Sequence, residues 1–291
     1  MHKPVLLNEI IQVLSPKINE NFIDATFGLG SVTFEILKYT SPKGKVLALE
    51  WDSELYKMGN KKIKELKMGK RIKLVNENFK NLKKVVKEEG FSQIKGIVFD
   101  LGISNWHYQE SKRGFSFKND EFLDMRINPQ IKITAFEIIN YFSYRELVEI
   151  FKNYGEEKEA GRIAKVIIDR RKKKKIETSK ELSEIVAQAK RVKRKIHPAT
   201  LVFMALRNFI NDELGNLETG LKEGYEVLDK GGKIVILSFN GLEDRVIKRV
   251  FKILQSQSAK IITKKAIKPT IEEIKNNPKS RSAKLRAIEK K

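Results

Sequence analysis

The feature that most constrains the fold is a short apolar run followed by an acidic residue and two glycines. Phe22-Ile23 leads into Asp24-Ala25-Thr26-Phe27-Gly28-Leu29-Gly30, and residues 32–37 have the character of a helix start. A strand, a glycine turn and a helix in this order are typical of the first unit of a parallel α/β sheet. Glycines at such a turn let a ligand approach the backbone at the carboxyl end of the strand, where open α/β sheets bind cofactors.

The alternation of strands and helices continues after this unit. Further strand-like runs lie at residues 45–49, 72–75 and 94–100, separated by lysine-rich stretches with helical character. The first of these runs leads into Glu50, about 20 residues after the glycines, which is the spacing of the acidic residue that binds a ribose in nucleotide-binding sheets. The sequence therefore predicts a parallel, Rossmann-like α/β sheet.

The pattern changes after Ser104. Residues 144–151, 158–171 and 180–189 carry helical periodicity, and no comparable strand appears among them until the strand-like run at 233–238. This order predicts a sheet domain interrupted in sequence by a helical insertion. We expect core segments at 1–104 and 207–291 and a helical, substrate-binding insertion at 105–206.

Composition excludes several classes of protein. No apolar run approaches the roughly 20 residues that a membrane helix needs, and the apolar stretch before Asn8 is too short for a signal peptide. The chain has no cysteine and only three histidines, far apart in sequence, so disulfides and a thiolate or histidine metal site are not expected. We expect a cytoplasmic protein without a metal or a membrane partner.

The charge favours a polyanionic partner. The 59 basic residues exceed the 37 acidic ones and give a formal net charge of +22. The abundance of lysine, isoleucine and asparagine offers another explanation, because an AT-rich genome produces the same bias. Basic runs at 170–175, with Lys172, Lys173 and Lys174, and at 190–195 lie in or next to the insertion, and we expect them to bind the phosphates of such a partner. Solvated helix faces or a loop are the alternative for each run.

The residues at the strand ends favour a nucleoside cofactor without a phosphate. The third glycine of a dinucleotide-binding turn falls here on Thr33, which counts against NAD. Glu50 is suited to accept hydrogen bonds from ribose hydroxyls, Phe79 to flank an adenine, and Asp24 to lie near a methionine moiety. S-adenosylmethionine has these parts. The alternative is that Asp24 and Glu50 only cap helices or turns.

Asp100-Leu101-Gly102-Ile103-Ser104 follows the fourth strand, where we predict catalysis. An exocyclic base amine is a poor nucleophile, so its N–H hydrogens must be accepted while its nitrogen is held in line with the methyl donor. Asp100 and Ser104 are the candidates for this, with a helix or turn cap as the alternative. Trp106, Tyr108, Phe115 and Phe117 are candidates to stack on an extruded base, although each is individually more typical of a core.

Read together, the motifs of this chain resemble the MraW family, the 16S ribosomal RNA cytosine-N4 methyltransferases, nearly from end to end. The segments that carry the resemblance are Pro4-Val5-Leu6-Leu7-x-Glu9, Asp24-x-Thr26-x-Gly28-x-Gly30, Asp100-Leu101-Gly102-x-Ser104, Arg113-Gly114-Phe115-Ser116-Phe117, Leu123-Asp124-Met125-Arg126, Tyr154-Gly155-Glu156-Glu157, His197-Pro198-Ala199-Thr200, Asn211-Asp212-Glu213-Leu214, Ser238-Phe239-x-x-Leu242-Glu243-Asp244-Arg245 and Arg281-Ser282-Ala283-Lys284-Leu285-Arg286.

The resemblance implies a class I S-adenosylmethionine-dependent methyltransferase sheet with a helical insertion. It implies N4-methylcytidine in the decoding region as product and 16S rRNA within the small ribosomal subunit as partner. It also implies residue roles. By position, the cofactor residues are Gly30, Ser31, Val32, Glu50, Phe79, Asp100 and His107, beside Asp24 and Gly28 from the turn. Arg113, Arg126 and His197 are candidates to bind the substrate. The alternatives are a bridge between insertion and core for the two arginines and a structural role at a helix start for His197.

Several positions depart from the family pattern. The family usually has Gly-Gly-His at Gly30-Ser31-Val32, Asp at Glu50, Gln at His107 and Ser-Phe-His-Ser at 238–241, where this chain has Ser-Phe-Asn-Gly. These changes cluster around the predicted active site. They leave two alternatives open: a divergent member that binds ribosomal RNA during subunit assembly with little catalysis, and a methyltransferase that acts on another RNA or on DNA.

Overall fold

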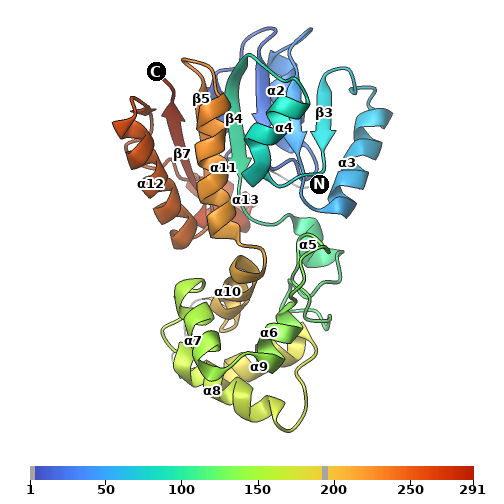
Figure 1. Cartoon of the computed structure of the whole chain (residues 1–291), viewed down its shortest axis with the longest axis vertical. Helices are drawn as coiled ribbons and strands as arrows, with labels where there is room; N and C mark the ends of the chain where they lie inside the picture. Colours follow the sequence, from blue (N-terminus) through green and yellow to red (C-terminus); the bar gives the residue numbers. More distant parts are fainter. Residues whose placement is uncertain (1–3, 192–195) are drawn as a thin grey trace. The chain divides into compact units, whose positions relative to one another are not determined.

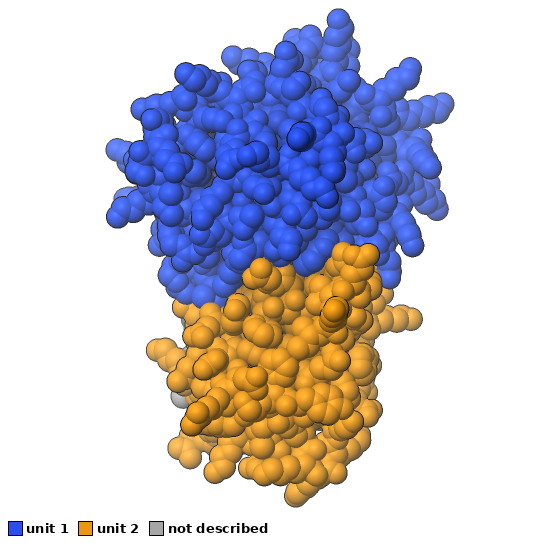
Figure 2. Space-filling model, in the orientation of Figure 1, with its two compact units in different colours: residues 1–102, 214–291 blue, residues 103–213 orange. Residues whose placement is uncertain are grey.

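A computed structural model describes residues 4–191 and 196–291 of the chain, so the end of the basic run predicted at 190–195 lies outside the described residues. The chain divides into two compact units, one formed by residues 1–102 and 214–291 and the other by residues 103–213 (Figure 2). The second boundary lies seven residues after the predicted one at 206/207. The reason is that α10 (Thr200–Ile210) runs through residue 206 and packs in the core of the helical unit.

The first unit is built on a seven-stranded sheet in the order β3-β2-β1-β4-β5-β7-β6 (Figure 1). The five strands from β1 to β5 pair in parallel, whereas β7 runs antiparallel to both β5 and β6. The Rossmann-like sheet predicted from the sequence is confirmed. The strands are β1 (Asn21–Asp24), β2 (Val46–Leu49), β3 (Ile72–Val75), β4 (Ile94–Asp100), β5 (Lys233–Ser238), β6 (Lys260–Ile261) and β7 (Lys284–Glu289).

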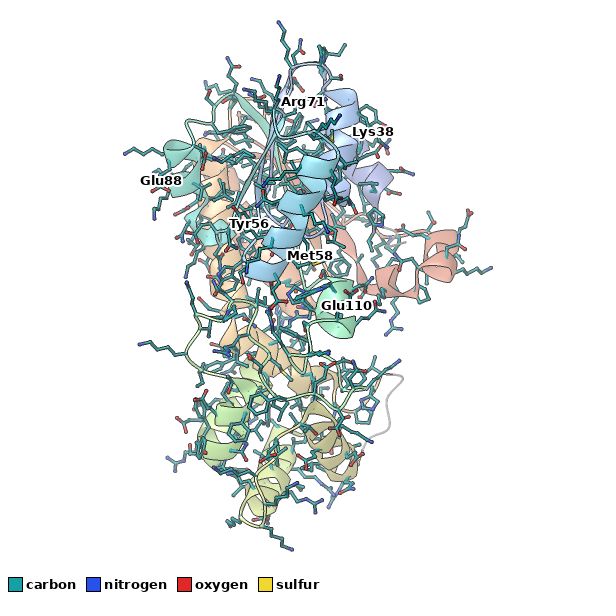
Figure 3. All side chains as sticks on the ribbon, turned by 90° about the vertical axis from the view of Figure 1, so that its right-hand side faces the viewer. Lys38, Tyr56, Met58, Arg71, Glu88 and Glu110 are labelled. Carbon is teal, nitrogen blue, oxygen red and sulfur yellow. The ribbon has the colours of Figure 1, made fainter. Side chains whose placement is uncertain are left out.

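Helices cover both faces of this sheet, because successive side chains of a strand point to opposite faces. Phe22 and Val46 pack with α1, α2 and α3, whereas Ile23 and Leu47 pack with α4, α11 and α12. Figure 3 shows Lys38 on α2 and Glu88 on α4 on opposite sides of the sheet. The helices are α1 (Leu7–Leu14), α2 (Ser31–Tyr39), α3 (Ser53–Glu65), α4 (Leu82–Glu88), α11 (Glu213–Val227) and α12 (Gly241–Ser256), with shorter turns at η1 (Phe79–Asn81), α13 (Ile271–Asn276) and η2 (Pro278–Ser282).

The second unit is helical and has its own apolar core. Thr134, Ser143 and Thr178 each begin a helix with a capping box, in which the hydroxyl and a glutamate three residues later satisfy backbone N–H groups reciprocally. Glu157 and Lys190 form a buried ion pair of 2.6 Å. The helices are α5 (Asn105–Gln109), α6 (Ala135–Tyr141), α7 (Tyr144–Asn153), α8 (Ala160–Arg171), α9 (Ser179–Ala189) and α10.

Candidate functional site

Three carboxylates lie where parallel strands end, and we call them the strand-end carboxylates. Asp24 is the last residue of β1, Glu50 follows β2, and Asp100 is the last residue of β4. The three strands are neighbours, since β1 pairs with β2 on one side and with β4 on the other. Their carboxyl ends therefore share one edge of the sheet, beside the point where the strand order reverses, which is the usual ligand position in open α/β sheets.

Asp24 is held rigidly in the interior. It is 1% exposed, its Oδ2 accepts a hydrogen bond of 2.7 Å from the Thr33 hydroxyl, and its Oδ1 accepts one of 3.2 Å from the Thr26 amide. Burial raises the pKa of Asp24 above its usual value, although these hydrogen bonds oppose the shift. Thr33, the residue that breaks the dinucleotide pattern in the sequence, thus orients the first strand-end carboxylate.

Glu50 closes the glycine turn. Its two carboxylate oxygens accept hydrogen bonds of 2.8 Å from the amides of Gly28 and Asp52. Burial raises the pKa of Glu50 to about 8, in spite of these two hydrogen bonds. Because a carboxylate offers about four acceptor positions, each oxygen keeps a lone pair for a ligand.

The two glycines of the turn serve different purposes. Gly28 has φ +55°, and a Cβ built on it would meet no atom within 4 Å, so this side of the turn is open to a ligand. Gly30 has φ +81°, and its Cβ would lie 2.6 Å from the Phe34 ring and 2.7 Å from the Phe27 ring. Gly28 therefore leaves room for a ligand, whereas Gly30 allows the aromatic packing under the turn.

The carboxyl group of Asp100 differs from those of Asp24 and Glu50 in its hydrogen bonding. The amide of Asp100 donates to the Thr26 hydroxyl at 2.7 Å, but Asp100 Oδ1 is buried and has no hydrogen-bond partner among the described residues. Burial, and next the negative charges of Asp24 and Glu243, raise the pKa of Asp100 to about 7. An unsatisfied buried acceptor costs about 1–3 kcal/mol, so the site fits a ligand that brings a hydrogen-bond donor or a positive charge to this oxygen.

Phe79 begins η1 after β3 and offers a flat apolar surface. Its ring meets Phe99 edge to face with centroids 5.6 Å apart, and Gly220 makes room for it, since a Cβ there would lie 2.6 Å from the ring. The neighbouring Asn78 has a buried Nδ2 with no acceptor among the described residues. An aromatic ring next to an orphaned donor suits a planar heterocycle such as adenine.

Ser104 and His107 belong to the helical unit. Ser104 is the N-cap residue of α5, and its hydroxyl lies 3.1 Å from His107 Nδ1. The His107 ring is buried and makes edge contacts with Trp106 and Phe115. The prediction that Trp106 and Phe115 stack on a base is not supported by the structure, because both rings are buried, 8% and 4% exposed.

The other predicted substrate residues make local contacts within the helical unit. Arg113 donates to the carbonyl oxygens of Arg126 and Ile127, and Arg126 forms a 2.7 Å ion pair with Asp124. His197 stacks on Phe117 with ring centroids 4.3 Å apart, and burial, then Lys118 and Lys190, lower the pKa of His197. These contacts give Arg113, Arg126 and His197 structural roles, and their contact with RNA stays a prediction.

The basic run at the end of α8 is exposed. Lys172 lies 3.4 Å from Asp169 and Lys174 lies 3.0 Å from Glu181, while Lys173 is exposed beside them. Exposed pairs of this kind contribute little to stability, so they are easily exchanged for phosphate contacts.

Three residues that shape the site were not assigned a role from the sequence. Thr26 and Thr33 bond to Asp100 and Asp24, and Glu243 adds negative charge near Asp100. Thr26 and Glu243 lie inside the motifs that carry the family resemblance, which is the signal that pointed to them. Nothing in the sequence indicated that the Thr33 hydroxyl would reach back to Asp24.

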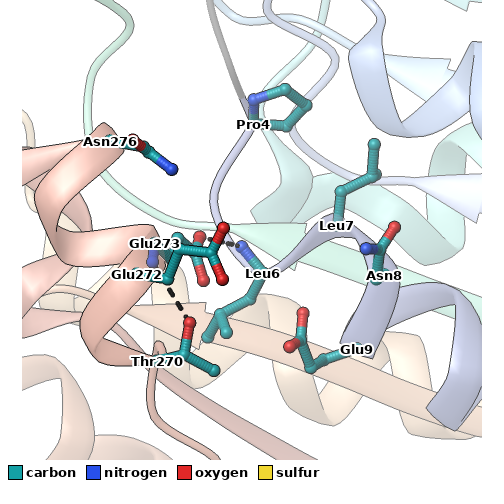
Figure 4. Close-up of a pocket in the computed structure, with 9 residues that line it drawn as sticks. All are labelled: Pro4, Leu6, Leu7, Asn8, Glu9, Thr270, Glu272, Glu273 and Asn276. Carbon is teal, nitrogen blue, oxygen red and sulfur yellow. Dashed lines mark hydrogen bonds between the residues drawn. The ribbon is translucent and has the colours of Figure 1, made fainter.

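The sheet unit also contains a hollow of about 370 Å³ between the N-terminal segment and α13 (Figure 4). Glu273 accepts a 2.9 Å hydrogen bond from the Leu6 amide, and Glu9 and Glu272 also line the hollow. None of the strand-end carboxylates lines it. Within the described ranges no group of histidine, aspartate and glutamate side chains is arranged to hold a metal ion, and no helix is long and apolar enough to cross a membrane.

Comparison with solved structures places the fold. A Streptococcus mutans protein solved in complex with SAH has a TM-score of 0.50 and 14% identity, covering 100% of both chains. A Clostridium thermocellum protein has a TM-score of 0.50 and 12% identity, covering 100% of this chain and 97% of that one. The fold is that of the class I S-adenosylmethionine-dependent methyltransferases.

Comparison with known sequences places the family. A Sulfurihydrogenibium protein named Ribosomal RNA small subunit methyltransferase H is 44% identical over 289 residues, 98% of this chain and 97% of that protein. A Wolbachia protein of the same name is 41% identical over 293 residues, 99% of each. The family model of the MraW methylases matches residues 1–291, and the chain belongs to the MraW methylase family.

Proposed function

We propose that this protein transfers a methyl group from S-adenosylmethionine to N4 of a cytidine in the decoding region of 16S rRNA. Its partner is 16S rRNA within the small ribosomal subunit, in the cytoplasm. Family membership and the names of the curated relatives support methylation of small-subunit rRNA. The observation that carries the proposal is the set of three strand-end carboxylates around an open glycine turn, with one buried oxygen of Asp100 that no described residue satisfies.

The parts of the cofactor match the site one by one. Glu50 accepts from the ribose hydroxyls, and Phe79 lies against the adenine. Asp24 attracts the ammonium group of the methionine moiety, and the open side of Gly28 leaves room for the nucleoside.

Two of the positions that depart from the family pattern contribute through the backbone. Ser31 is the first residue of α2, so its amide belongs to the unpaired first turn of that helix. Val32 is buried in the apolar core, and only its backbone remains for the cofactor. Gly30 and His107 complete the proposed set.

S-adenosylmethionine supplies an electrophilic methyl group on a sulfonium. Asp100 and Ser104 position the nucleophile: they accept the two N–H hydrogens of the exocyclic amine and hold its nitrogen in line with the methyl carbon. Because the pKa of Asp100 is about 7, its carboxylate is available near neutral pH to accept the proton that N4 loses. Attack is direct, so no enzyme nucleophile is needed, and the chain has no cysteine to provide one.

The helical unit docks the RNA in this proposal. Lys172, Lys173 and Lys174 neutralise phosphates, and Arg113, Arg126 and His197 support the loops that meet the substrate. The exposure of the three lysines at the end of α8 favours this assignment for them.

The test is to incubate the purified protein with labelled S-adenosylmethionine and small ribosomal subunits that lack the modification. The RNA is then digested and its labelled nucleoside identified. Labelled N4-methylcytidine is the expected product, and another labelled nucleoside would replace the substrate assignment. Subunit binding without any label, beside an active control enzyme, would favour an assembly factor and implicate Ser31, Val32, His107, Asn240 and Gly241.

A further inference from the structure

A second hollow of about 240 Å³ in the sheet unit is lined by residues to which the proposed function assigns no contact with the cofactor or the RNA. Phe239, Asn240 and Gly241 come from the segment after β5, and residues 281–284 come from η2 and the start of β7. Lys268 completes the wall. Segments about 40 residues apart in sequence, both among those that carry the family resemblance, thus meet at one place.

The wall of this hollow is positively charged. Lys268, Arg281 and Lys284 line it, and no carboxylate does. Lys268 and Arg281 are exposed, and neither has an ion pair or hydrogen bond within the described part of the chain. Two cationic side chains that line the same hollow without a counter-ion indicate an anion-binding site.

Two acids bond to residues of this wall, and both already have partners. Glu243 accepts hydrogen bonds from the Phe239 amide at 2.7 Å and from Asn240 Nδ2 at 2.5 Å. Lys284 lies 3.2 Å from Asp244, which also forms a 2.6 Å ion pair with Arg286 and lies 3.8 Å from Lys248. Burial acts to raise the pKa of Asp244, but the hydrogen bonds from Arg286 and Lys284 outweigh it, and the pKa lies below its usual value. Asp244 therefore cannot also compensate Lys268 and Arg281.

The backbone adds donors to the same wall. Gly241 is the first residue of α12, a helix of 16 residues whose N-cap Asn240 accepts from the Glu243 amide at 3.0 Å. Amides in the first turn of a helix have no acceptor within the helix and favour anions. Ser282, also in the wall, offers a hydroxyl donor. Guanidinium, ammonium, hydroxyl and amide donors together fit a phosphate group.

The position of the hollow relative to Asp100 identifies the source of the phosphate. Asp100 pairs with Leu237 in the sheet, and the Leu101 amide donates to the Leu237 carbonyl at 3.1 Å. Phe239 follows Leu237 by two residues, so the hollow begins at the sheet edge where Asp100 lies. S-adenosylmethionine has no phosphate, and an RNA backbone has one for each nucleotide.

We infer that this hollow binds a backbone phosphate of the RNA substrate, close to the nucleotide that reacts at Asp100. This inference rests on the proposed function for the identity of the polyanion. It assigns Lys268, Arg281 and the start of α12 to substrate binding, in addition to the helical unit. The acidic hollow between the N-terminal segment and α13 would repel the same phosphate.

The experiment compares the double variant Lys268→Gln/Arg281→Gln with the wild type and with Lys230→Gln. Lys230 is an exposed lysine without an ion pair in the described part, in the turn before β5 at the opposite edge of the sheet. Binding of the intact protein to small ribosomal subunits is measured from 50 to 200 mM salt. Loss of one phosphate contact should reduce the slope of log K against log salt by about 0.7. Between 50 and 200 mM salt, the factor by which affinity falls should then be about threefold smaller for the double variant than for the wild type.

Two further readouts separate this inference from the proposed function. Methyl transfer by the double variant should show a raised KM for subunits with kcat unchanged, and calorimetry should show unchanged binding of S-adenosylhomocysteine. A wild type that transfers no methyl, but whose salt slope still falls in the double variant, would sink the proposed function and keep the phosphate site. A double variant with the wild-type slope and KM would overturn the site. The inference would also be overturned if the wild type binds inorganic phosphate, the double variant does not, and both bind subunits equally. The hollow would then be a site for free phosphate.

Discussion

Ionisation of Glu50 should control how tightly the cofactor binds. Burial raises the pKa of this carboxyl to about 8, so at pH 7 roughly nine-tenths of the protein carries it protonated. Two ribose hydroxyls donate hydrogen bonds, and an ionised carboxylate accepts both, whereas a protonated carboxyl has given up acceptor capacity to its own proton. Binding should therefore select the ionised form and release a proton.

The size of the effect follows from the pKa. Ionising a group one unit below its pKa costs about 1.4 kcal/mol, which corresponds to about tenfold in affinity. The dissociation constant of S-adenosylhomocysteine should fall about tenfold between pH 7 and pH 9, and about 0.9 proton should leave Glu50 for each ligand bound at pH 7. Asp100, with a pKa of about 7, is half ionised at pH 7 and adds less.

The assay is titration calorimetry in two buffers of different ionisation enthalpy, which measures the protons released. S-adenosylhomocysteine is the ligand because it transfers no methyl group and its sulfur carries no charge. The variant Asp100→Asn is the matched control, since it removes the carboxyl of Asp100, whose pKa is about 7, and leaves Glu50 in place. An affinity that is flat from pH 6 to pH 9, with no proton released in Asp100→Asn, would refute the assignment of Glu50 to the ribose.

Four further predictions concern the strand-end carboxylates, the glycine turn and the basic run at the end of α8. The free energy of unfolding should fall as pH rises in urea titrations, because Glu50 and Asp100 hold their protons when folded and lose them on unfolding. The fall should be about 1.4 kcal/mol per pH unit for each group, from about pH 5 to 7 for Asp100 and from about pH 5 to 8 for Glu50. Asp100→Ala should lower kcat by orders of magnitude, and near-normal turnover would remove Asp100 from the mechanism. Gly30→Ala should cost about 2–4 kcal/mol in denaturant unfolding, because of its positive φ and the rings beneath it. Gly69→Ala, where a Cβ meets nothing, is the control. Replacing Lys172–Lys174 by glutamine should flatten the salt dependence of subunit binding, and an unchanged slope would count against phosphate contact there.

The parallel half of the sheet was predictable because its strands follow simple rules. Parallel strands are buried on both faces and therefore appear in the sequence as short apolar runs. All five predicted runs overlap the strands from β1 to β5. The two antiparallel strands carry weaker signals. β6 has two residues, and β7 (Lys284–Glu289) mixes charged and apolar residues in a basic C-terminal segment. These two strands are specified by their pairing, β7 with β5 and β6 with β7, rather than by their own pattern.

The positions of the strand-end carboxylates were predictable, but their chemistry was not. Spacing alone placed Asp24, Glu50 and Asp100 at strand ends, because each follows an apolar run. Their pKa values depend on burial and on charges from distant segments, such as Glu243 beside Asp100, which no local pattern contains. The same limit applies to Trp106, since an aromatic residue in a motif looks alike in sequence whether it is buried or exposed.

The departures from the family pattern at Ser31 and Val32 leave the architecture of the site in place. Val32 packs in the apolar core, and the turn before it is shaped by glycine backbone and by the carboxylate of Glu50. Asp100 Oδ1, buried and without a hydrogen-bond partner in the described ranges, costs the folded protein free energy that an apolar residue would save. A protein that only bound RNA would have no physical reason to retain this destabilising group. In an enzyme, a hydrogen-bond donor from the cofactor or the amine removes the penalty when it reaches the oxygen. The retained unsatisfied acceptor at Asp100 therefore favours catalysis over an assembly role.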